Sequence, residues 1–303
     1  MAHVKGMSDR EQSRLLEMDN YIGAMKQLYQ EALQANFEIY DIASVHTNCF
    51  KDITAEAILL DSRIIKILRY AIAPSISQMK FGQFVGLSSV GSFENSKVVG
   101  GTIFDSLCMV AEDLSAFVTT NIDQDRFVWI KDKALETESA LQNARKWTCS
   151  IAAGQNAETS YRNWRKSKQE TSIHRLLESR GYIKTKLKGP LKSERDLEIG
   201  CYTAEVRVQG RTIQKADVVF RSKINNKLVL IEAKAVGVEL DATKRIKECS
   251  DKASDWRHAV ALNHPIMVSV IAGFFSENNI SNLGASDVNV VWEHKLEALD
   301  EYL

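Results

Sequence analysis

The chain has 303 residues, of which 45% are hydrophobic and only three are proline. A chain of this length and apolar content can bury one large core or two ordinary cores without covalent or metal staples. The formal net charge is zero, and charged residues interrupt the longest apolar runs well before they reach the length of a bilayer span, so the composition excludes a membrane-embedded protein.

The five cysteines favour a reducing environment. They lie far apart, are odd in number and form no CxxC pair, which argues against a disulfide framework and against a zinc knuckle. The N-terminus lacks the pattern of a secretory signal. We therefore expect a cytoplasmic protein without a membrane partner.

Helical periodicity dominates the first half of the chain. Apolar residues recur at three- and four-residue spacing in segments near 8–35, 54–73, 103–122 and 125–180. We expect these segments to form a helical N-terminal region over residues 1–158.

From Gly181 onward the pattern changes to strands. Six stretches have the composition of strands, with a helix near 242–262 between the fourth and the fifth: GYIKTKLKG, CYTAEVRVQ, KADVVFRS, KLVLIEAKA, HPIMVSVIAGFF and VNVVWEH. The sequence thus predicts an α+β fold, with a mixed α/β domain over residues 159–303 and a mixed central sheet.

Positive charge is concentrated in this second part. Residues 161–257 contain 23 Lys and Arg against 13 Asp and Glu. Such an excess suits a polyphosphate ligand, although a helix or strand also needs a solvated face.

The stretch ADVVFRSKINNKLVLIEAKA, residues 216–235, has the pattern of a hairpin whose apolar strands carry charges at core positions. With KINNKL as the turn, residues whose numbers sum to about 449 lie opposite one another, which places Asp217 against Glu232. Opposed carboxylates in an apolar setting need a cation between them. Lys234 shares a face with Glu232, while Ala233 points away and leaves its carbonyl available. Such oxygen ligands suit Mg²⁺.

Asp217, fourteen further residues and then Glu232-Ala233-Lys234 resemble the signature of PD-(D/E)xK nucleases, with Ala216 in place of the usual proline. The resemblance implies an αβββαβ core, and the order of the predicted elements matches it. An edge hairpin with an exposed Glu–Lys pair is the structural alternative, but charges within apolar runs fit an exposed face poorly.

The PD-(D/E)xK family often carries an acidic residue on the helix before the first strand. Glu170 is our first candidate for this residue and Glu178 the second. The two lie eight residues apart and close to one helical face, so their spacing does not choose between them.

A narrower resemblance covers more of the chain. The segments LVLIEAKAVGVELDATKRIKECSDKASDWRHAV, VSVIAGFF and VNVVWEHKLEAL resemble the C-terminal half of XamI-type type II restriction endonucleases. The resemblance implies double-stranded DNA as the substrate and a site-specific double-strand break as the product.

A segment of the N-terminal half could read DNA. In SQMKFGQFVGLSS, small residues fall at the spacing of the first helix and turn of a helix-turn-helix, although the continuation departs from that pattern at Gly91 and Phe93. A plain helical corner is the alternative. Within the segment 77–97 the candidate DNA contacts are Ser88, Ser89, Asn95 and Lys97.

Other basic residues could contact phosphates or serve a solvated helix face: Lys244, Arg245, Lys247 and Arg257. The six histidines form no nuclease-like cluster, and the glycines form no P-loop, so we expect neither a histidine–metal nuclease nor a nucleotide cofactor.

These observations favour a Mg²⁺-dependent type II restriction endonuclease that leaves a 5′-phosphate and a 3′-hydroxyl. We assign catalysis to Asp217, Glu232, Lys234 and Glu170, and metal binding to Asp217, Glu232 and the Ala233 carbonyl. A palindromic site would call for a homodimer. If like charges meet in the hairpin, alanine at either carboxylate should end cleavage without destabilising the fold. The alternatives are a repair or recombination nuclease and a non-catalytic DNA-binding regulator.

Overall fold

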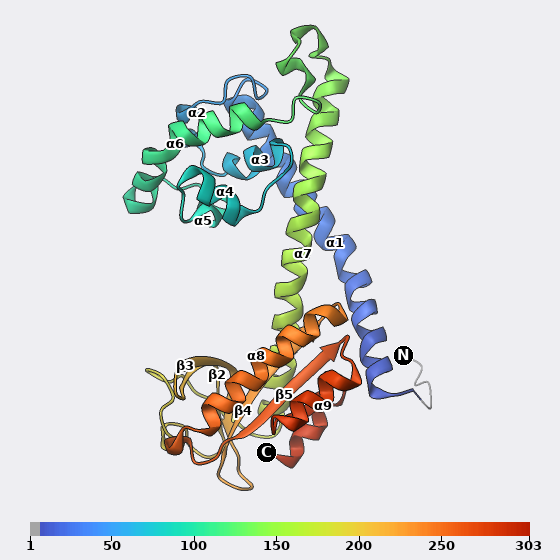
Figure 1. Ribbon diagram of the computed structural model, residues 1–303, viewed down its shortest axis with the longest axis vertical. Helices are drawn as coiled ribbons and strands as arrows, with labels where there is room; N and C mark the ends of the chain where they lie inside the picture. The colour runs from blue at the N-terminus through green and yellow to red at the C-terminus, as the bar shows by residue number, and fades with distance from the viewer. Residues whose placement is uncertain (1–6) are drawn as a thin grey trace. The chain divides into compact units, whose positions relative to one another are not determined.

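A computed structural model describes residues 7–303, which fold into two compact units. Residues 25–160 form one unit, and residues 161–303 form the other together with the segment up to Ala24. The helices α1 (Asp9–His46) and α7 (Glu138–Ser179) contribute residues to both units (Figure 1). The expected division near residue 158 lies close to the end of the first unit, but the start of α1 groups with the C-terminal unit.

The unit of residues 25–160 is entirely helical in its regular structure. Besides parts of α1 and α7 it holds α2 (Ala55–Leu60), α3 (Ile64–Ala71), α4 (Gln78–Val85), α5 (Val90–Asn95) and α6 (Gly101–Asn121). Its core is an apolar cluster with large, fully buried members that include Ile58, Leu68, Phe93, Leu114 and Phe127. The apolar faces that the sequence predicted for these helices thus pack together in one core.

Two predicted helices of this unit are shorter or broken. The segment 54–73 divides into α2 and α3 because Asp61 ends α2 in an extended conformation and accepts hydrogen bonds from the Arg63 backbone and guanidinium. The segment 125–180 begins with two short 3₁₀ turns, and α7 starts only at Glu138, where the hydroxyl of Thr137 accepts the Ala140 N–H. Short polar side chains that bond the backbone locally compete with helix formation.

The C-terminal unit is built on a sheet of six strands in the order of the sequence. The first strand pairs with the second in parallel, and the fourth, fifth and sixth strands are also parallel to one another. The second, third and fourth strands are antiparallel neighbours. The strands are β1 (Ile183–Lys184), β2 (Cys201–Gln209), β3 (Ile213–Arg221), β4 (Leu228–Val236), β5 (Ile266–Gly273) and β6 (Asn289–Trp292). This mixed sheet and the helices confirm the predicted α+β class.

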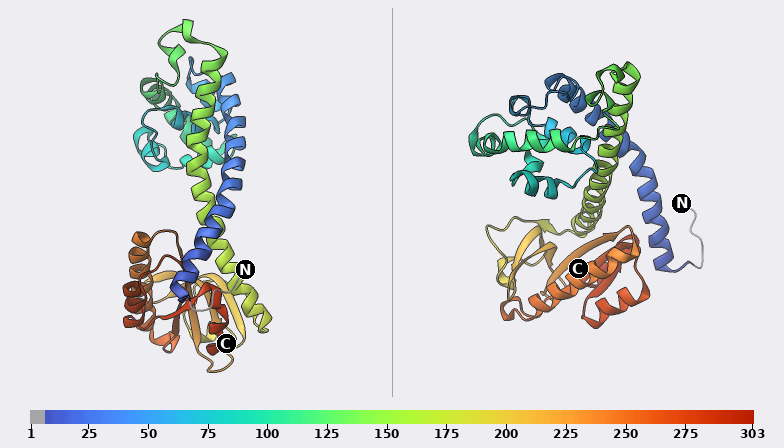
Figure 2. Two further views of the ribbon diagram at one scale, coloured as in Figure 1. Left: turned by 90° about the vertical axis from the view of Figure 1, so that its right-hand side faces the viewer. Right: turned by 45° about the horizontal axis from the view of Figure 1, so that its top comes forward.

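Helices cover both faces of the sheet. On one face lie α8 (Glu239–Arg257) and α9 (Glu277–Ala285), which pack over β4 and β5 around Trp256, Ile271 and Leu283. On the other face lie the end of α7 and the 3₁₀ segment η5 (Glu293–Glu301), around Ile173 and Leu299. Figure 2 shows the sheet between the orange helices and the yellow-green end of α7. Strands buried on both faces explain the continuous apolar runs of β4 and β5.

The start of α1 belongs to this unit through specific bonds. The Ser13 hydroxyl accepts the backbone N–H of Gly273 at 2.8 Å, where β5 ends. The buried Glu17 carboxylate accepts hydrogen bonds from the Tyr161 hydroxyl at 2.6 Å and the Arg165 guanidinium at 2.7 Å, both on α7. These are tertiary contacts between segments far apart in sequence, which helical periodicity does not reveal.

The hairpin register agrees with the predicted pairing. Val218 lies opposite Ile231 and Arg221 lies opposite Leu228, which is the expected sum rule, and residues 222–227 form the turn. Other C-terminal predictions were less accurate. The first strand is only two residues long, α8 ends at Arg257, and α9 was not predicted at all. α9 has only nine residues, with Ile280 and Leu283 as its two large apolar side chains, so the helical pattern in the sequence is short.

No helix in the described part of the chain has the length and apolar composition needed to cross a bilayer. Each of the five cysteines, all within residues 7–303, has a free thiol.

Candidate active site

The strands β3 and β4 separate at Asp217. Their paired ladder ends at Val218 and Ile231, and the next residues, Asp217 and Glu232, do not pair through the backbone. Instead, the Asp217 carboxylate accepts the backbone N–H of Ala233 at 2.9 Å. The Asp217 side chain therefore replaces a backbone hydrogen bond between the two strands. It satisfies the buried Ala233 N–H while the strands separate at this point.

An unusual backbone conformation on β2 lies beside this gap. Glu205 has a φ of 50°, a left-handed conformation that costs energy for a residue with a Cβ atom. The β2–β3 ladder pairs Ala204 with Val218 and Val206 with Ala216, and it omits Glu205 and Asp217. The side chains before and after Asp217 on β3 point to opposite faces of the sheet. Ala216 packs in the apolar cluster beneath α8, and Val218 packs in the cluster beneath the end of α7. The alternation of side chains between the two faces of the sheet therefore shifts by one residue in β2 and β3 at the candidate site.

Glu232 is fully buried and is held between two lysines. Lys234, two residues further along β4, donates to Oε2 at 2.7 Å, as strand periodicity predicted. Lys252 of α8 donates to Oε1 at 2.8 Å and also to the Lys215 carbonyl at 2.6 Å. A fully buried carboxylate needs such partners, because an unpaired one would be expensive.

Glu170 of α7 belongs to the same region as Asp217. Its Oε1 lies 3.4 Å from the Lys166 ammonium, and that oxygen is buried without a hydrogen-bond partner. Burial raises the pKa of Glu170, with the nearby Asp217 charge adding to the increase and Lys166 opposing it. Glu178 instead accepts the Tyr202 hydroxyl at 2.6 Å. The geometry therefore favours Glu170 over Glu178.

We define this site as the carboxylates Glu170, Glu205, Asp217 and Glu232 with the lysines Lys166, Lys215, Lys234 and Lys252. Glu170, Glu205 and Glu232 are each ion-paired with at least one of these lysines. Glu205 pairs with Lys215 at 2.6 Å and with Lys166 at 3.6 Å. The bond from Lys215 lowers the pKa of Glu205. Burial alone would lower the pKa of Lys234, but Glu232 and Asp217 together raise it, so Lys234 is a cation at neutral pH.

The oxygen atoms at this site suit a hard divalent cation. Within residues 7–303 no three His, Cys, Asp or Glu side chains are arranged together as a metal cage. Magnesium needs no such cage, since it is usually bound through one or two carboxylates together with waters and substrate phosphates. Glu232 and Asp217 supply two carboxylates. The buried Oε1 of Glu170, which accepts no hydrogen bond and lies 3.4 Å from the Lys166 ammonium, is a further oxygen atom. The residues present therefore fit Mg²⁺.

The segment 77–97 forms two short helices joined by a tight turn. A Cβ atom on Gly82 would lie 2.4 Å from the Leu87 carbonyl oxygen, and Gly86 ends α4 with a φ of 72°. Both positions therefore require glycine. The buried Glu94 of α5 binds Arg69 at 2.7 Å and Gln78 at 2.7 Å, which ties the two helices to α3.

The four predicted contacts in this segment are on its surface: Ser88, Ser89, Asn95 and Lys97 are all exposed. Because α5 has only six residues, the turn before it and the residues after it carry most of these side chains. A surface of small polar side chains is available to a base edge or a phosphate.

The basic residues predicted on α8 have different surroundings. Lys244 and Lys247 are exposed, and Arg245 pairs with Glu248 at 3.1 Å. Arg257 donates to the Ser286 carbonyl at 2.5 Å and lies 3.4 Å from Asp287, so it joins the end of α8 to the turn after α9. These contacts give Arg257 a structural role whether or not it reaches DNA.

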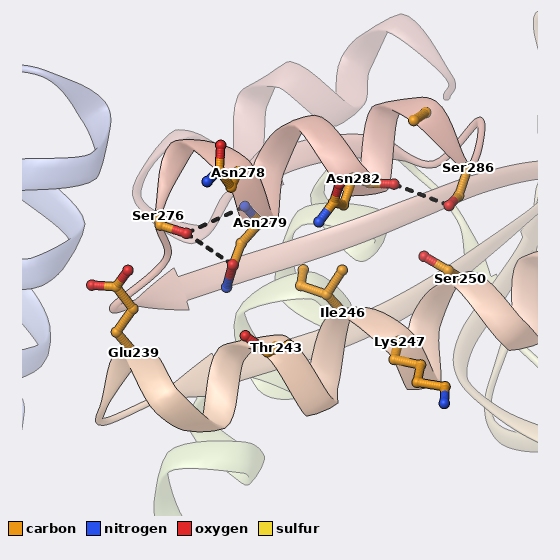
Figure 3. Close-up of a pocket in the computed structure, with 11 residues that line it drawn as sticks. Glu239, Thr243, Ile246, Lys247, Ser250, Ser276, Asn278, Asn279, Asn282 and Ser286 are labelled. Carbon is orange, nitrogen blue, oxygen red and sulfur yellow. Dashed lines mark hydrogen bonds between the residues drawn. The ribbon is translucent and has the colours of Figure 1, made fainter.

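A cavity of about 640 Å³ lies between α8 and α9, away from the predicted catalytic residues. Figure 3 shows its polar lining, in which Asn279 is bonded to Ser276 and faces the helix that carries Thr243 and Lys247. A duplex is cut on an extended surface, because an interface with DNA buries far more area than a pocket of this size offers. We therefore do not take this cavity as the active site.

Sequence reasoning missed four members of the site: Lys166, Glu205, Lys215 and Lys252. One signal was present. Lys252 lies three residues after Cys249 and four before Trp256, so it borders the buried stripe of α8. Glu205 gave no signal, because its left-handed backbone arises only within the folded sheet.

Comparisons with known proteins agree with the geometry. A model of the XamI restriction endonuclease family matches residues 48–292. The chain is also 23% identical over 299 residues to the type II restriction enzyme SalI of Streptomyces albus G, an alignment that covers 92% of this chain and 91% of the relative. Because the family model spans both the helical half and the D…ExK hairpin, this chain belongs to the XamI restriction endonuclease family and is a type II site-specific deoxyribonuclease.

Proposed function

We propose that this enzyme hydrolyses phosphodiester bonds of double-stranded DNA with Mg²⁺ as its cofactor. The observation that carries the proposal is the position of Asp217 and Glu232 at the gap between β3 and β4, with Lys234 beside them. Family membership supports cleavage at a specific site. Among the alternatives, a non-catalytic regulator does not agree with that membership, and no feature of the site favours a repair nuclease.

Asp217, Glu232 and the Ala233 carbonyl would hold the cation. When bound, Mg²⁺ supplies a Lewis acid that polarises the scissile phosphate and lowers the pKa of coordinated water. Asp217 is held in position by the Ala233 N–H, so its carboxylate needs little reorganisation. Glu170, which lies near Asp217 and whose buried Oε1 accepts no hydrogen bond, would assist as a further oxygen ligand, directly or through water.

Lys234 would orient the attacking water. In the metal-free protein Glu232 and Asp217 raise the pKa of its ammonium, which is therefore a proton donor there. A cation beside the water favours the hydroxide form and stabilises the negative charge of the transition state. In-line attack at phosphorus would leave a 5′-phosphate and a 3′-hydroxyl.

The segment 77–97 and the basic residues of α8 would contact the DNA. Ser88, Ser89, Asn95 and Lys97 are exposed and suit base edges or phosphates, as do Lys244, Arg245 and Lys247. A homodimer would bring two sites to the two strands of a palindrome. We place the enzyme in the cytoplasm, where five free thiols are compatible with a reducing environment.

Incubation of the purified protein with a plasmid of known sequence, with Mg²⁺ or with EDTA, tests the proposal. We expect discrete fragments only with Mg²⁺, each ligatable without kinase treatment because its 5′ end carries phosphate. Lys234→Ala should abolish these fragments while metal-dependent DNA binding persists. Fragments of the same size in EDTA, or an intact plasmid under all conditions, would contradict the proposal.

A further inference from the structure

Lys252 is not part of the D…ExK motif, yet it makes one of the two ion pairs of the buried Glu232. Its ammonium lies 2.8 Å from Oε1, and Lys234 holds Oε2 at 2.7 Å. Both oxygens of the carboxylate are therefore occupied by lysines. Glu232 can offer an oxygen to a divalent cation only after one of the lysines has moved.

The surroundings indicate which lysine moves. Lys234 has a second carboxylate nearby, Asp217, whose charge contributes to its raised pKa. The other hydrogen-bond acceptor of Lys252 is the neutral carbonyl of Lys215. The Lys252 side chain is 21% exposed, whereas Lys234 is 13% exposed and attached to the same strand as Glu232. The Lys252 ammonium also lies 5.7 Å from the centroid of the Trp256 ring. Of the two lysines, Lys252 is therefore the more exposed, and its contacts other than Glu232 are with uncharged groups.

A released Lys252 needs a new anion. Its ammonium would otherwise remain beside a site that has gained positive charge, and like charges at short range repel strongly away from bulk water. Duplex DNA brings phosphates to this surface, and lysine binds phosphate as a flexible point charge. The side chain has four methylene groups, so it can change partner while α8 stays in place.

We propose that Lys252 is a positioning residue that holds Glu232 in the metal-free enzyme and transfers to a DNA phosphate when a divalent cation takes the carboxylate. The inference rests on the proposed metal-dependent function. It makes metal and DNA binding mutually supportive, because each ligand removes an obstacle to the other. A lysine with only a structural role would join α8 to β3 and β4 without affecting either affinity in this manner.

The first measurement is calorimetric titration of the metal-free protein with Ca²⁺ as the probe cation. We expect Lys252→Met to bind Ca²⁺ about tenfold more tightly than the wild type, because no competing ammonium has to leave, which corresponds to about 1.4 kcal/mol. Lys252→Arg keeps the charge and should stay near the wild type. Lys146→Met removes an exposed lysine of α7 that is neither part of the site nor a predicted DNA contact, so it controls for charge loss alone.

The second measurement is the salt dependence of DNA binding in Ca²⁺, with a plasmid fragment that the wild type cuts in Mg²⁺. Loss of one phosphate contact in Lys252→Met should reduce the slope of log K against log salt by about 0.9. Lys252→Gln, which keeps an N–H donor for the Lys215 carbonyl, serves as the second variant if Lys252→Met is poorly folded.

The outcomes separate this inference from the proposed function. If the wild type binds Ca²⁺ and cuts DNA in Mg²⁺, but Lys252→Met and Lys252→Gln bind Ca²⁺ with unchanged or weaker affinity, the transfer of Lys252 is wrong and the metal mechanism stands. A wild type that neither binds the cation nor cuts DNA overturns both.

Discussion

The Asp217 carboxylate accepts the backbone N–H of Ala233 across the gap between two strands, at 2.9 Å. This bond replaces the ladder contact that ends at Val218 and Ile231. One side chain therefore both satisfies the buried backbone and carries the negative charge assigned to metal binding. The two roles can be separated by mutation.

Asp217→Asn keeps an oxygen acceptor for the Ala233 N–H but loses the charge. We expect it to retain nearly the stability of the wild type while cleavage disappears. Asp217→Ala also removes the acceptor, so it should lower the free energy of unfolding by about 1–3 kcal/mol, the cost of an unpaired buried N–H. Urea unfolding and plasmid cleavage measure the two effects. Equal stability of both variants would show that water replaces the carboxylate.

Glu232→Ala should destabilise the protein, contrary to the expectation drawn from opposed carboxylates alone. The structure shows Glu232 ion-paired with Lys234 and Lys252, so its removal leaves Lys252 without its carboxylate partner and Lys234 with only the nearby Asp217 charge. We expect a loss of about 3–5 kcal/mol in the free energy of unfolding, as for other broken buried pairs. Adding Lys252→Met should recover part of it. A double variant less stable than Glu232→Ala would contradict the charge argument.

Glu170 should make folding stability depend on pH. Burial raises its pKa above the ordinary value of 4.5. A carboxyl group whose pKa is higher in the folded protein than in the unfolded chain favours folding when protonated. Its stabilising effect is complete below the unfolded pKa and is lost as pH rises through the folded pKa. Glu170→Gln should therefore flatten the stability profile from about pH 4.5 upward, measured by urea unfolding at several pH values. An identical profile in both proteins would assign the dependence elsewhere.

Charge reversal of Lys244 and Arg245 should weaken DNA binding. Each lost phosphate contact is expected to reduce the salt slope by about 0.9. Fluorescence anisotropy with a labelled duplex at several salt concentrations measures the slope. Reversal of Lys26 and Lys146, both exposed and neither a predicted DNA contact, is a control with the same charge change. An unchanged salt slope in the variant with Lys244 and Arg245 reversed would show that these two residues serve only as a solvated face of the helix.

Ser89 and Asn95 should contribute to site preference if the segment 77–97 reads DNA. Replacing both by alanine should reduce discrimination between the cognate site and a site with one substituted base pair, by about 1–3 kcal/mol for each lost base contact. Both side chains are exposed, so folding should be unaffected. Comparison of cleavage rates on the two substrates measures the effect. Full discrimination in a folded double variant would move base reading to other loops.

The sequence alone determined the features that depend on near neighbours in the chain. The turn around residues 222–227 and the two-residue period of strands were sufficient to predict the register of β3 and β4 and the contact between Glu232 and Lys234. The order of strand-like and helical stretches after Gly181 also predicted a mixed α/β domain around a central sheet. These inferences need no knowledge of distant segments.

Only the tertiary structure decided which distant side chains complete the site. Lys252 reaches Glu232 because α8 packs back across β4, and Glu170 is preferred to Glu178 because that part of α7 lies near Asp217. The structure leads us to revise the stability expectation for Glu232 for the same reason, since its countercharges come from another element as well as its own strand. Hydrophobic periodicity specifies which face of a helix is buried, but it does not specify which residues of other elements that face packs against. That choice depends on packing and on the pairing of buried charges, which exist only in the folded chain.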